Sequence, residues 1–237
     1  MAGEGLRPPL RVAIFDLFGT LVPEFPRSGF LTMIRHAARA LGADEDAFLD
    51  GWSETALVRQ TGGYAGGVGE NVRAIVASLG LAQPPDAVVA EALAPRLAMY
   101  ERWFVPRPGA LETVTALRER GIPLGLISMC APDTPPVWRA SPFARLFAVE
   151  VFSSEVGLRK PDPAIYRYAL DRLGAEAGGT LYCGDGAYGE LTGAEAVGMT
   201  AVEIRDPQIV TSEQLRPEGE DWQGPWVADL RDLLSWF

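Results

Sequence analysis

The sequence predicts an α/β protein with a doubly wound parallel sheet, and two observations carry this prediction. Short apolar runs recur along the chain, which is typical of strands that are buried on both faces of a parallel sheet. Amphipathic helical patterns alternate with these runs, and alternating strands and helices build such a sheet. The expected strands cover residues 10–15, 122–127, 148–152, 180–183 and 200–204, and the expected helices cover residues 110–120, 163–173 and 190–197.

The interval between the first two expected strands breaks this alternation. Pro84-Pro85-Asp86 marks the start of a helix, and the glycine-rich residues 62–67 form a flexible break. We therefore expect a Rossmann-like core with an inserted all-helical cap domain over the carboxyl edge of its sheet. Four consecutive amphipathic patterns make up this cap, over residues 30–41, 45–59, 70–79 and 86–100.

Proline-containing segments at residues 22–24 and 105–109 are the expected hinges of the insertion. The predicted core domain therefore comprises residues 1–22 and 105–237, and the predicted cap domain comprises residues 23–104. Residues 222–237 are rich in aromatic side chains, and we expect a last helix there that packs against the core.

The composition restricts the expected partners and location. A net charge of −10 disfavours nucleic acid and anionic membrane surfaces as partners. Cys130 and Cys183, the only cysteines, lie in apolar surroundings, which indicates reduced thiols. The chain shows neither a signal peptide nor a run that could span a bilayer, so we expect a soluble cytoplasmic protein. An anionic small-molecule substrate would need a local cation, and the oligomeric state leaves no signal in the sequence.

Asp16 is the first candidate for chemistry, because it comes directly after the first expected strand. Ligands enter an open α/β sheet at the carboxyl ends of its strands. A carboxylate at this position can act as a nucleophile and form a covalent intermediate. Ser128 and Asp185 also follow expected strands, so we expect all three side chains at one edge of the sheet.

Four segments occur along the chain in a fixed order: Asp16-x-Phe18-Gly19-Thr20, Ser128, Lys160-Pro161-Asp162-Pro163, and Gly184-Asp185-Gly186 with Glu190. In these segments the chain resembles the haloacid dehalogenase superfamily, whose hydrolases use an aspartate nucleophile. The resemblance covers almost the whole chain and includes the position of the helical cap. It implies that Asp16 is the nucleophile and that the chain is a hydrolase.

The physical chemistry of the other candidates agrees with these roles. Ser128 would donate a hydrogen bond to the transferring group. Lys160 is the only lysine of the chain, and its ammonium would keep Asp16 ionised and neutralise charge in the transition state. Asp185 and Glu190, together with Asp16 and the backbone carbonyl of Phe18, offer the oxygen ligands that Mg²⁺ prefers.

Phe18 departs from the phosphatase pattern of this superfamily. Phosphatases usually have a second aspartate two residues after the nucleophile, which protonates the leaving oxygen and later activates water. Phe18 can do neither, so general acid–base assistance of ~10²–10⁴-fold is missing unless a cap residue supplies it. Haloacid dehalogenases have an aromatic residue at this position, because halide leaves as a stable anion.

Three functions are therefore open. Asp16, Asp185 and Glu190 near one cleft, opposed only by Lys160, would raise one another's pKa, and a divalent cation relieves that repulsion. We therefore favour a Mg²⁺-dependent phosphatase that acts on a small substrate with a good leaving group, such as an acyl or aryl phosphate. The alternatives are a metal-free 2-haloacid dehalogenase and a non-catalytic module that senses phosphate or binds a partner.

The substrate-contacting residues are harder to predict. Phe18 and Thr20 are candidates because they lie beside the nucleophile, and Arg59 and Tyr64 are candidates because they flank the glycine-rich break of the cap. A hinge or solvated loop is the simpler interpretation for the latter pair. The cap loops set the choice of substrate, which the sequence does not reveal.

Overall fold

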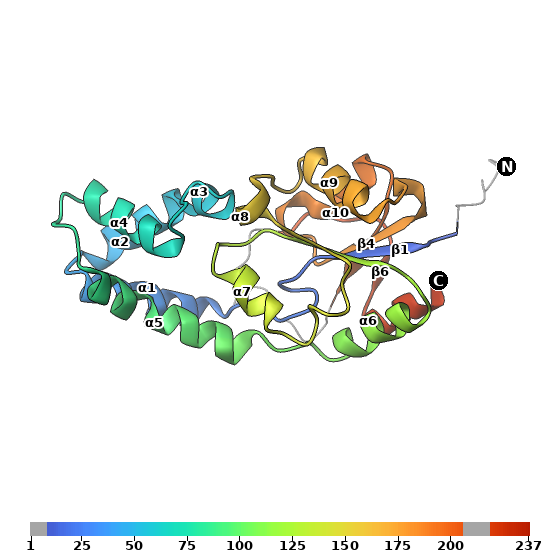
Figure 1. Cartoon of the computed structure of the whole chain (residues 1–237), viewed down its shortest axis with the longest axis horizontal. Helices are drawn as coiled ribbons and strands as arrows, with labels where there is room; N and C mark the ends of the chain where they lie inside the picture. Colours follow the sequence, from blue (N-terminus) through green and yellow to red (C-terminus); the bar gives the residue numbers. More distant parts are fainter. Residues whose placement is uncertain (1–8, 206–218) are drawn as a thin grey trace.

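The structure, a computed structural model, describes residues 9–205 and 219–237. In this part of the chain six parallel strands form one sheet, in the order β3-β2-β1-β4-β5-β6 (Figure 1). This arrangement confirms the predicted α/β class with its parallel sheet. The strands are β1 (Val12–Phe15), β2 (Leu124–Ser128), β3 (Val149–Phe152), β4 (Thr180–Gly184), β5 (Thr200–Ile204) and β6 (Trp226–Val227).

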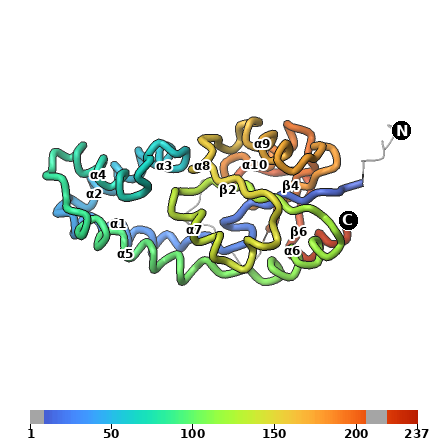
Figure 2. The backbone as a smooth tube through the Cα atoms, in the orientation of Figure 1, coloured from blue at the N-terminus to red at the C-terminus, as the bar shows by residue number. Residues whose placement is uncertain are grey.

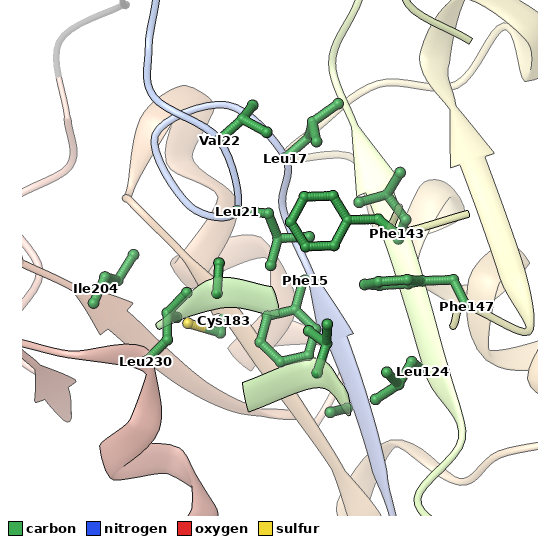
Figure 3. Close-up of a cluster of buried hydrophobic side chains, with 14 of the residues drawn as sticks. Phe15, Leu17, Leu21, Val22, Leu124, Phe143, Phe147, Cys183, Ile204 and Leu230 are labelled. Carbon is green, nitrogen blue, oxygen red and sulfur yellow. The ribbon is translucent and has the colours of Figure 1, made fainter. Parts of the chain in front are cut away.

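Alternate residues of β1 point to opposite faces of the sheet, as the period of two in a strand requires. Ala13 and Phe15 belong to one apolar cluster, which includes α6 (Ala110–Glu119) and the 3₁₀ helix η4 (Leu230–Ser235). Figure 3 shows part of this cluster, with Phe15 and Leu230 from elements far apart in the sequence. Val12 and Ile14 belong to the cluster of the other face.

The second face is covered by α9 (Pro163–Leu173) and α10 (Glu190–Ala196), which lie across the sheet from α6 (Figure 1). Both faces of the central strands are therefore buried, which explains why the strands read as continuous apolar runs. Four further short helices lie between the strands along the chain: α7 (Thr134–Arg139), α8 (Ser153–Val156), η1 (Ala177–Gly179) and η2 (Ala187–Gly189).

The expected last helix over residues 222–237 is wrong in part. Residues 226–227 form β6, which pairs with β5, and only Leu230–Ser235 is helical, as the 3₁₀ helix η4. Proline restricts the backbone and ends helices, and Pro225 precedes β6 directly. Leu230 and Leu233 of η4 are buried, so the tail does pack against the core.

Five helices lie between β1 and α6, and this block has an apolar cluster of its own, which includes Phe48, Trp52 and Ile75. Figure 2 shows this block extending from one end of the sheet. The boundaries predicted for a separate cap domain, at residues 22–23 and 104–105, stay a prediction. The helices are α1 (Arg27–Ala40), α2 (Glu45–Glu54), α3 (Ala56–Gln60), α4 (Val68–Ser78) and α5 (Asp86–Trp103).

The single helix expected over residues 45–59 is two helices, α2 and α3, with Thr55 between them. The Thr55 hydroxyl donates to the Gly51 carbonyl oxygen at 2.7 Å, and such back-bonding bends helices. The bend matters for the site, because α3 carries Arg59 and Gln60. No helix among the described residues combines the length and the apolar character needed to cross a bilayer.

Candidate active site

Asp16 stands at the carboxyl end of β1, the strand between β2 and β4 in the sheet. Its backbone N–H donates to the Cys183 carbonyl oxygen at 2.9 Å, so the β1–β4 ladder fixes its position. The chain then turns at Gly19, whose φ of 79° lies in the left-handed region. A Cβ atom at Gly19 would also collide with the Asp185 carboxylate. Glycine is therefore required here for both its backbone conformation and its size.

Lys160 bridges two carboxylates from different elements. Its Nζ lies 2.5 Å from Asp16 Oδ1 and 2.5 Å from Glu190 Oε2, and all three side chains are buried. Burial alone would lower the pKa of Lys160, but the charges of Asp16 and Glu190 raise it above its usual range. Lys160 is therefore a permanent cation beside the nucleophile.

Asp185 and Glu190 follow β4 and complete the acidic cluster. Glu190 Oε2 also accepts from the Tyr182 hydroxyl at 2.6 Å, and Oε1 accepts from the Gly186 N–H at 3.1 Å. One carboxylate oxygen from each of Asp16, Asp185 and Glu190 lies within 4.8 Å of the other two. The sequence therefore brings three buried acids to one point.

The electrostatics of this cluster are dominated by burial. Desolvation and the Glu190 charge raise the pKa of Asp16 to about 6, although Lys160 opposes the shift. Desolvation and the Asp185 charge likewise raise the pKa of Glu190. With three carboxylates and one ammonium group, the cluster has an excess of two negative charges when all four groups are ionised.

This donor set fits Mg²⁺. The ion prefers carboxylate and carbonyl oxygens, and a divalent charge would balance the excess of the cluster. The residues that would hold it are Asp16 and Asp185 directly, the Phe18 carbonyl, and Glu190 through its contacts to water. Glu190 already accepts hydrogen bonds on both oxygens, which favours this indirect role.

Ser128 ends β2, beside β1. Its hydroxyl oxygen is fully buried and has no hydrogen-bond partner among the described residues. Buried polar groups are normally hydrogen-bonded, so this hydroxyl has capacity for an oxygen of a bound group. Thr20, by contrast, donates to Asp16 Oδ2 at 3.1 Å and so orients the nucleophile from within the core.

A cavity of about 570 Å³ opens over Asp16 and continues beneath the helices α1, α2, α3 and α5. Among the predicted site residues, Asp16, Phe18 and Arg59 line this cavity. Lys160, Ser128, Thr20, Asp185 and Glu190 do not line it and are buried at the same edge of the sheet, and Tyr64 is half-buried outside the cavity lining.

Phe18 directs its ring toward the helical block. Its ring centroid lies 5.1 Å from that of Phe25, 6.2 Å from that of Phe104 and 6.5 Å from that of Tyr100. The side chain at this position therefore joins the apolar wall of the cavity.

Sequence reasoning missed two polar contacts at this cavity. Arg96 of α5 forms an ion pair with Asp133, and Tyr100 joins them with a hydroxyl 3.1 Å from Asp133 Oδ1. Gln60 of α3 donates to the Tyr188 hydroxyl at 3.0 Å, and Tyr188 adopts a φ of 60°, in the left-handed region. The close glycines at 186 and 189 were a signal for a tight turn, but nothing in the sequence pairs residue 60 with residue 188.

Known proteins similar to this chain include phosphatases. A phosphoglycolate phosphatase of Rhodospirillum rubrum is 34% identical over 202 residues, which cover 81% of this chain and 78% of the relative. A glyceraldehyde 3-phosphate phosphatase of Methanopyrus kandleri is 28% identical over 157 residues, which cover 65% of this chain and 66% of the relative.

Solved structures of both phosphatases and dehalogenases share the fold. A phosphatase from Thermococcus onnurineus aligns with a TM-score of 0.65 and 22% identity, over 95% of this chain and 97% of that structure. A 2-haloacid dehalogenase from Pseudomonas syringae pv. tomato aligns with a TM-score of 0.67 and 19% identity, over 96% and 97%. At such identities the likeness concerns the fold alone.

The family profile of haloacid dehalogenase-like hydrolases matches residues 10–198. This range runs from the strand before Asp16 to the helix that begins with Glu190, so it contains all the residues of the acidic cluster and the lysine that bridges two of them. The resemblance read from the sequence is thereby confirmed, and the chain belongs to the haloacid dehalogenase-like hydrolases.

Proposed function

We propose that this chain is a Mg²⁺-dependent phosphatase that acts on a small phosphorylated metabolite with a good leaving group. The observation that carries this proposal is the cluster of three buried carboxylates with one ammonium group, of which Asp16 lines the cavity. A metal-free dehalogenase needs only one of these carboxylates, and the negative charges of the other two would not be fully compensated. The proposed partner is thus a small anionic molecule, and the proposed location is the cytoplasm.

Asp16 would attack the phosphorus atom, and the bond between phosphorus and the leaving-group oxygen would break with its electron pair on that oxygen. Lys160 and Thr20 hold the carboxylate in place through its two oxygens. Ser128 would donate to a phosphoryl oxygen. Bound Mg²⁺ would supply charge neutralisation for the phosphoryl oxygens. Water then releases phosphate from the aspartyl phosphate and regenerates Asp16.

The nature of residue 18 limits the leaving group. Residue 18 cannot protonate the departing oxygen, because its side chain is an apolar ring that packs against Phe25 and Phe104. The leaving group must then depart as an anion of moderate basicity. Aryl phosphates and acyl phosphates meet this requirement, whereas alkyl phosphates do not.

Phe18 also favours the second candidate function, 2-haloacid dehalogenase activity. In that reaction Asp16 would attack carbon and displace halide without a metal. A halide-release assay with and without EDTA separates the two functions. Release of halide that resists the chelator, with no hydrolysis of 4-nitrophenyl phosphate, would replace the phosphatase proposal.

The direct experiment is hydrolysis of 4-nitrophenyl phosphate by the purified chain with Mg²⁺ or with EDTA. We expect turnover only with Mg²⁺, loss of turnover in Asp16→Asn, and a decrease of roughly 10²-fold or more in Asp185→Asn, because metal assistance is worth several kcal/mol. Asp171→Asn is the matched control, since Asp171 is an exposed carboxylate on α9. Equal activity of Asp185→Asn and the control would contradict the proposal.

A further inference from the structure

Arg59 is a buried cation with an unused hydrogen-bonding edge. The residue is 6% exposed and lines the cavity, and its guanidinium carbon lies 4.1 Å from the centroid of the Trp52 ring. Nη1 donates to the Trp52 carbonyl oxygen at 3.1 Å and to Asn71 Oδ1 at 2.7 Å. Nε and Nη2 have no acceptor among the described residues, and Arg59 forms no ion pair with any of them.

The neighbouring Arg96 shows what this edge binds. Arg96 presents Nε and Nη2 to the two carboxylate oxygens of Asp133, the bidentate geometry in which guanidinium and carboxylate match. Arg96 also lines the cavity and lies over the same Trp52 ring, at 5.5 Å. Two guanidinium groups therefore share one part of the cavity, and Asp133 neutralises one of them.

The surroundings of Arg59 disfavour its positive charge. Burial and the charge of Arg96 lower the pKa of Arg59 to about 10, although the charge of Asp133 opposes the shift, so Arg59 stays protonated at neutral pH. A buried charge is stable only when it is paired, which points to an anion supplied by a ligand.

The wall between Asp16 and Arg59 is aromatic. Phe18 lies next to Tyr100, Tyr100 lies next to Arg96, and Arg96 in turn lies over Trp52. A volume of about 570 Å³ exceeds what a two-carbon phosphate would fill and suits a substrate with a ring. Aromatic side chains also pack favourably against a flat ring. The apolar lining includes Phe18, Phe25, Phe30, Trp52, Met99 and Tyr100.

Resting on the proposed function, we infer that the substrate is an aromatic phosphate monoester that carries a second anionic group, a carboxylate, which Arg59 binds through Nε and Nη2. The phosphate lies over Asp16, the ring lies along the aromatic wall, and the carboxylate reaches the guanidinium. The ring also makes the leaving oxygen a phenolate, which departs without the acid that residue 18 lacks.

A matched pair of substrates tests this subsite: 4-(phosphonooxy)benzoate and 4-(phosphonooxy)benzamide, which have the same shape and differ in one charge. We expect the wild-type chain with Mg²⁺ to prefer the benzoate in kcat/KM by ~10-fold or more, since a charge-assisted bidentate pair contributes at least ~1.4 kcal/mol. We expect Arg59→Gln to abolish the preference between the two compounds. Arg59→Lys retains part of it. Arg35→Gln, which removes an exposed arginine of α1, keeps the full preference.

Binding measurements separate this inference from the proposed function. Calorimetric titration of the Asp16→Asn variant with each compound reports the preference without turnover. A preference in binding with no hydrolysis by the wild-type chain would support the subsite and sink the phosphatase. Hydrolysis of both compounds at equal kcat/KM, or a preference that persists in a folded Arg59→Gln variant, would overturn the subsite. A preference for the bisphosphate 4-(phosphonooxy)phenyl phosphate over the benzoate would indicate that Nε and Nη2 of Arg59 bind a phosphate group rather than a carboxylate.

Discussion

Phe18 lies two residues after the nucleophile, and its ring packs among other rings of the cavity wall. Replacing it with aspartate places an acid at the position where phosphatases of the family have one. We predict that Phe18→Asp raises kcat for an alkyl phosphate by ~10²-fold, because general acid catalysis contributes about that much. Turnover of 4-nitrophenyl phosphate, whose leaving group needs no acid, changes little.

The control for this prediction is Phe18→Asn. Asparagine has the shape and polarity of aspartate but cannot donate and recover a proton. Both variants lose the ring contacts with Phe25 and Phe104, so both lower the thermal midpoint by a similar amount. An equal gain in the two variants, or no gain in a folded Phe18→Asp protein, would show that the acid is not what limits the site.

Lys160 forms ion pairs with two carboxylates, and its removal leaves Asp16 and Glu190 close to each other without a cation between them. We predict that Lys160→Met lowers kcat/KM for 4-nitrophenyl phosphate by ~10²-fold or more, because the variant loses the charge that keeps Asp16 ionised. The exposed neighbour Arg159 supplies the control, since Arg159→Met removes a cation outside the cluster. Steady-state kinetics of the two variants, alongside their circular dichroism spectra, check this prediction.

At the scale of elements, a hydrogen bond joins the helical block α1–α5 to the segment after β4 that contains Asp185. Gln60 of α3 reaches Tyr188 of η2, three residues after Asp185, and both side chains line the cavity. We predict that Gln60→Leu raises KM by roughly 5-fold, since a net hydrogen bond contributes about 1 kcal/mol. Exchange of amide hydrogens in α3 should also become faster.

Tyr188→Phe removes the same hydrogen bond from the other side and should give the same two effects. A double variant should then add nothing to either single change, because both remove one contact. Unchanged amide exchange in all three proteins would mean that this hydrogen bond does not hold α3 over the loop.

The elements also show what local sequence can and cannot predict. β1 and β4 were predictable because strands buried on both faces must be continuously apolar, whatever surrounds them. β6 has two residues, which is too short to show any period, and its pairing with β5 depends on where Pro225 ends the preceding loop. Asp16, Lys160 and Glu190 were predictable as a group only because a family resemblance links three segments that are distant in sequence.

Contacts across the cavity lie beyond such patterns. Arg96 and Asp133 are 37 residues apart, and no spacing rule connects a helix of the insertion with the segment after β2. Arg59 was singled out because it lies near a glycine-rich break, and that signal also pointed to Tyr64, which does not line the cavity. Pairings that depend on how helices lie over a sheet are properties of the tertiary structure.

For the whole molecule, the C-terminal segment closes one face of the sheet. Leu230 lies in the cluster that contains Phe15 (Figure 3), and Leu233 is buried in the same cluster. Arg120 donates to the Leu234 carbonyl oxygen at 2.6 Å. We predict that Leu233→Ala lowers the free energy of unfolding by ~2–5 kcal/mol, as expected for a leucine truncated in a close-packed core.

Leu234→Ala is the matched control, because the neighbouring side chain is only half-buried. It should cost clearly less in the same urea titration, followed by circular dichroism. Equal destabilisation by the two truncations would indicate that the tail contributes through its backbone pairing with β5 and its hydrogen bond from Arg120 rather than through the buried leucine.

Because the single lysine of the chain is 3% exposed and locked between two acids, reagents that acylate amines have no accessible side-chain target in the native protein. Modification of Lys160 by an N-hydroxysuccinimide ester therefore requires opening of the sheet edge where catalysis is proposed. Peptide mass spectrometry after timed exposure to such an ester would therefore measure how fast Lys160 becomes accessible. The same measurement with a bound ligand would show how much the ligand slows this opening.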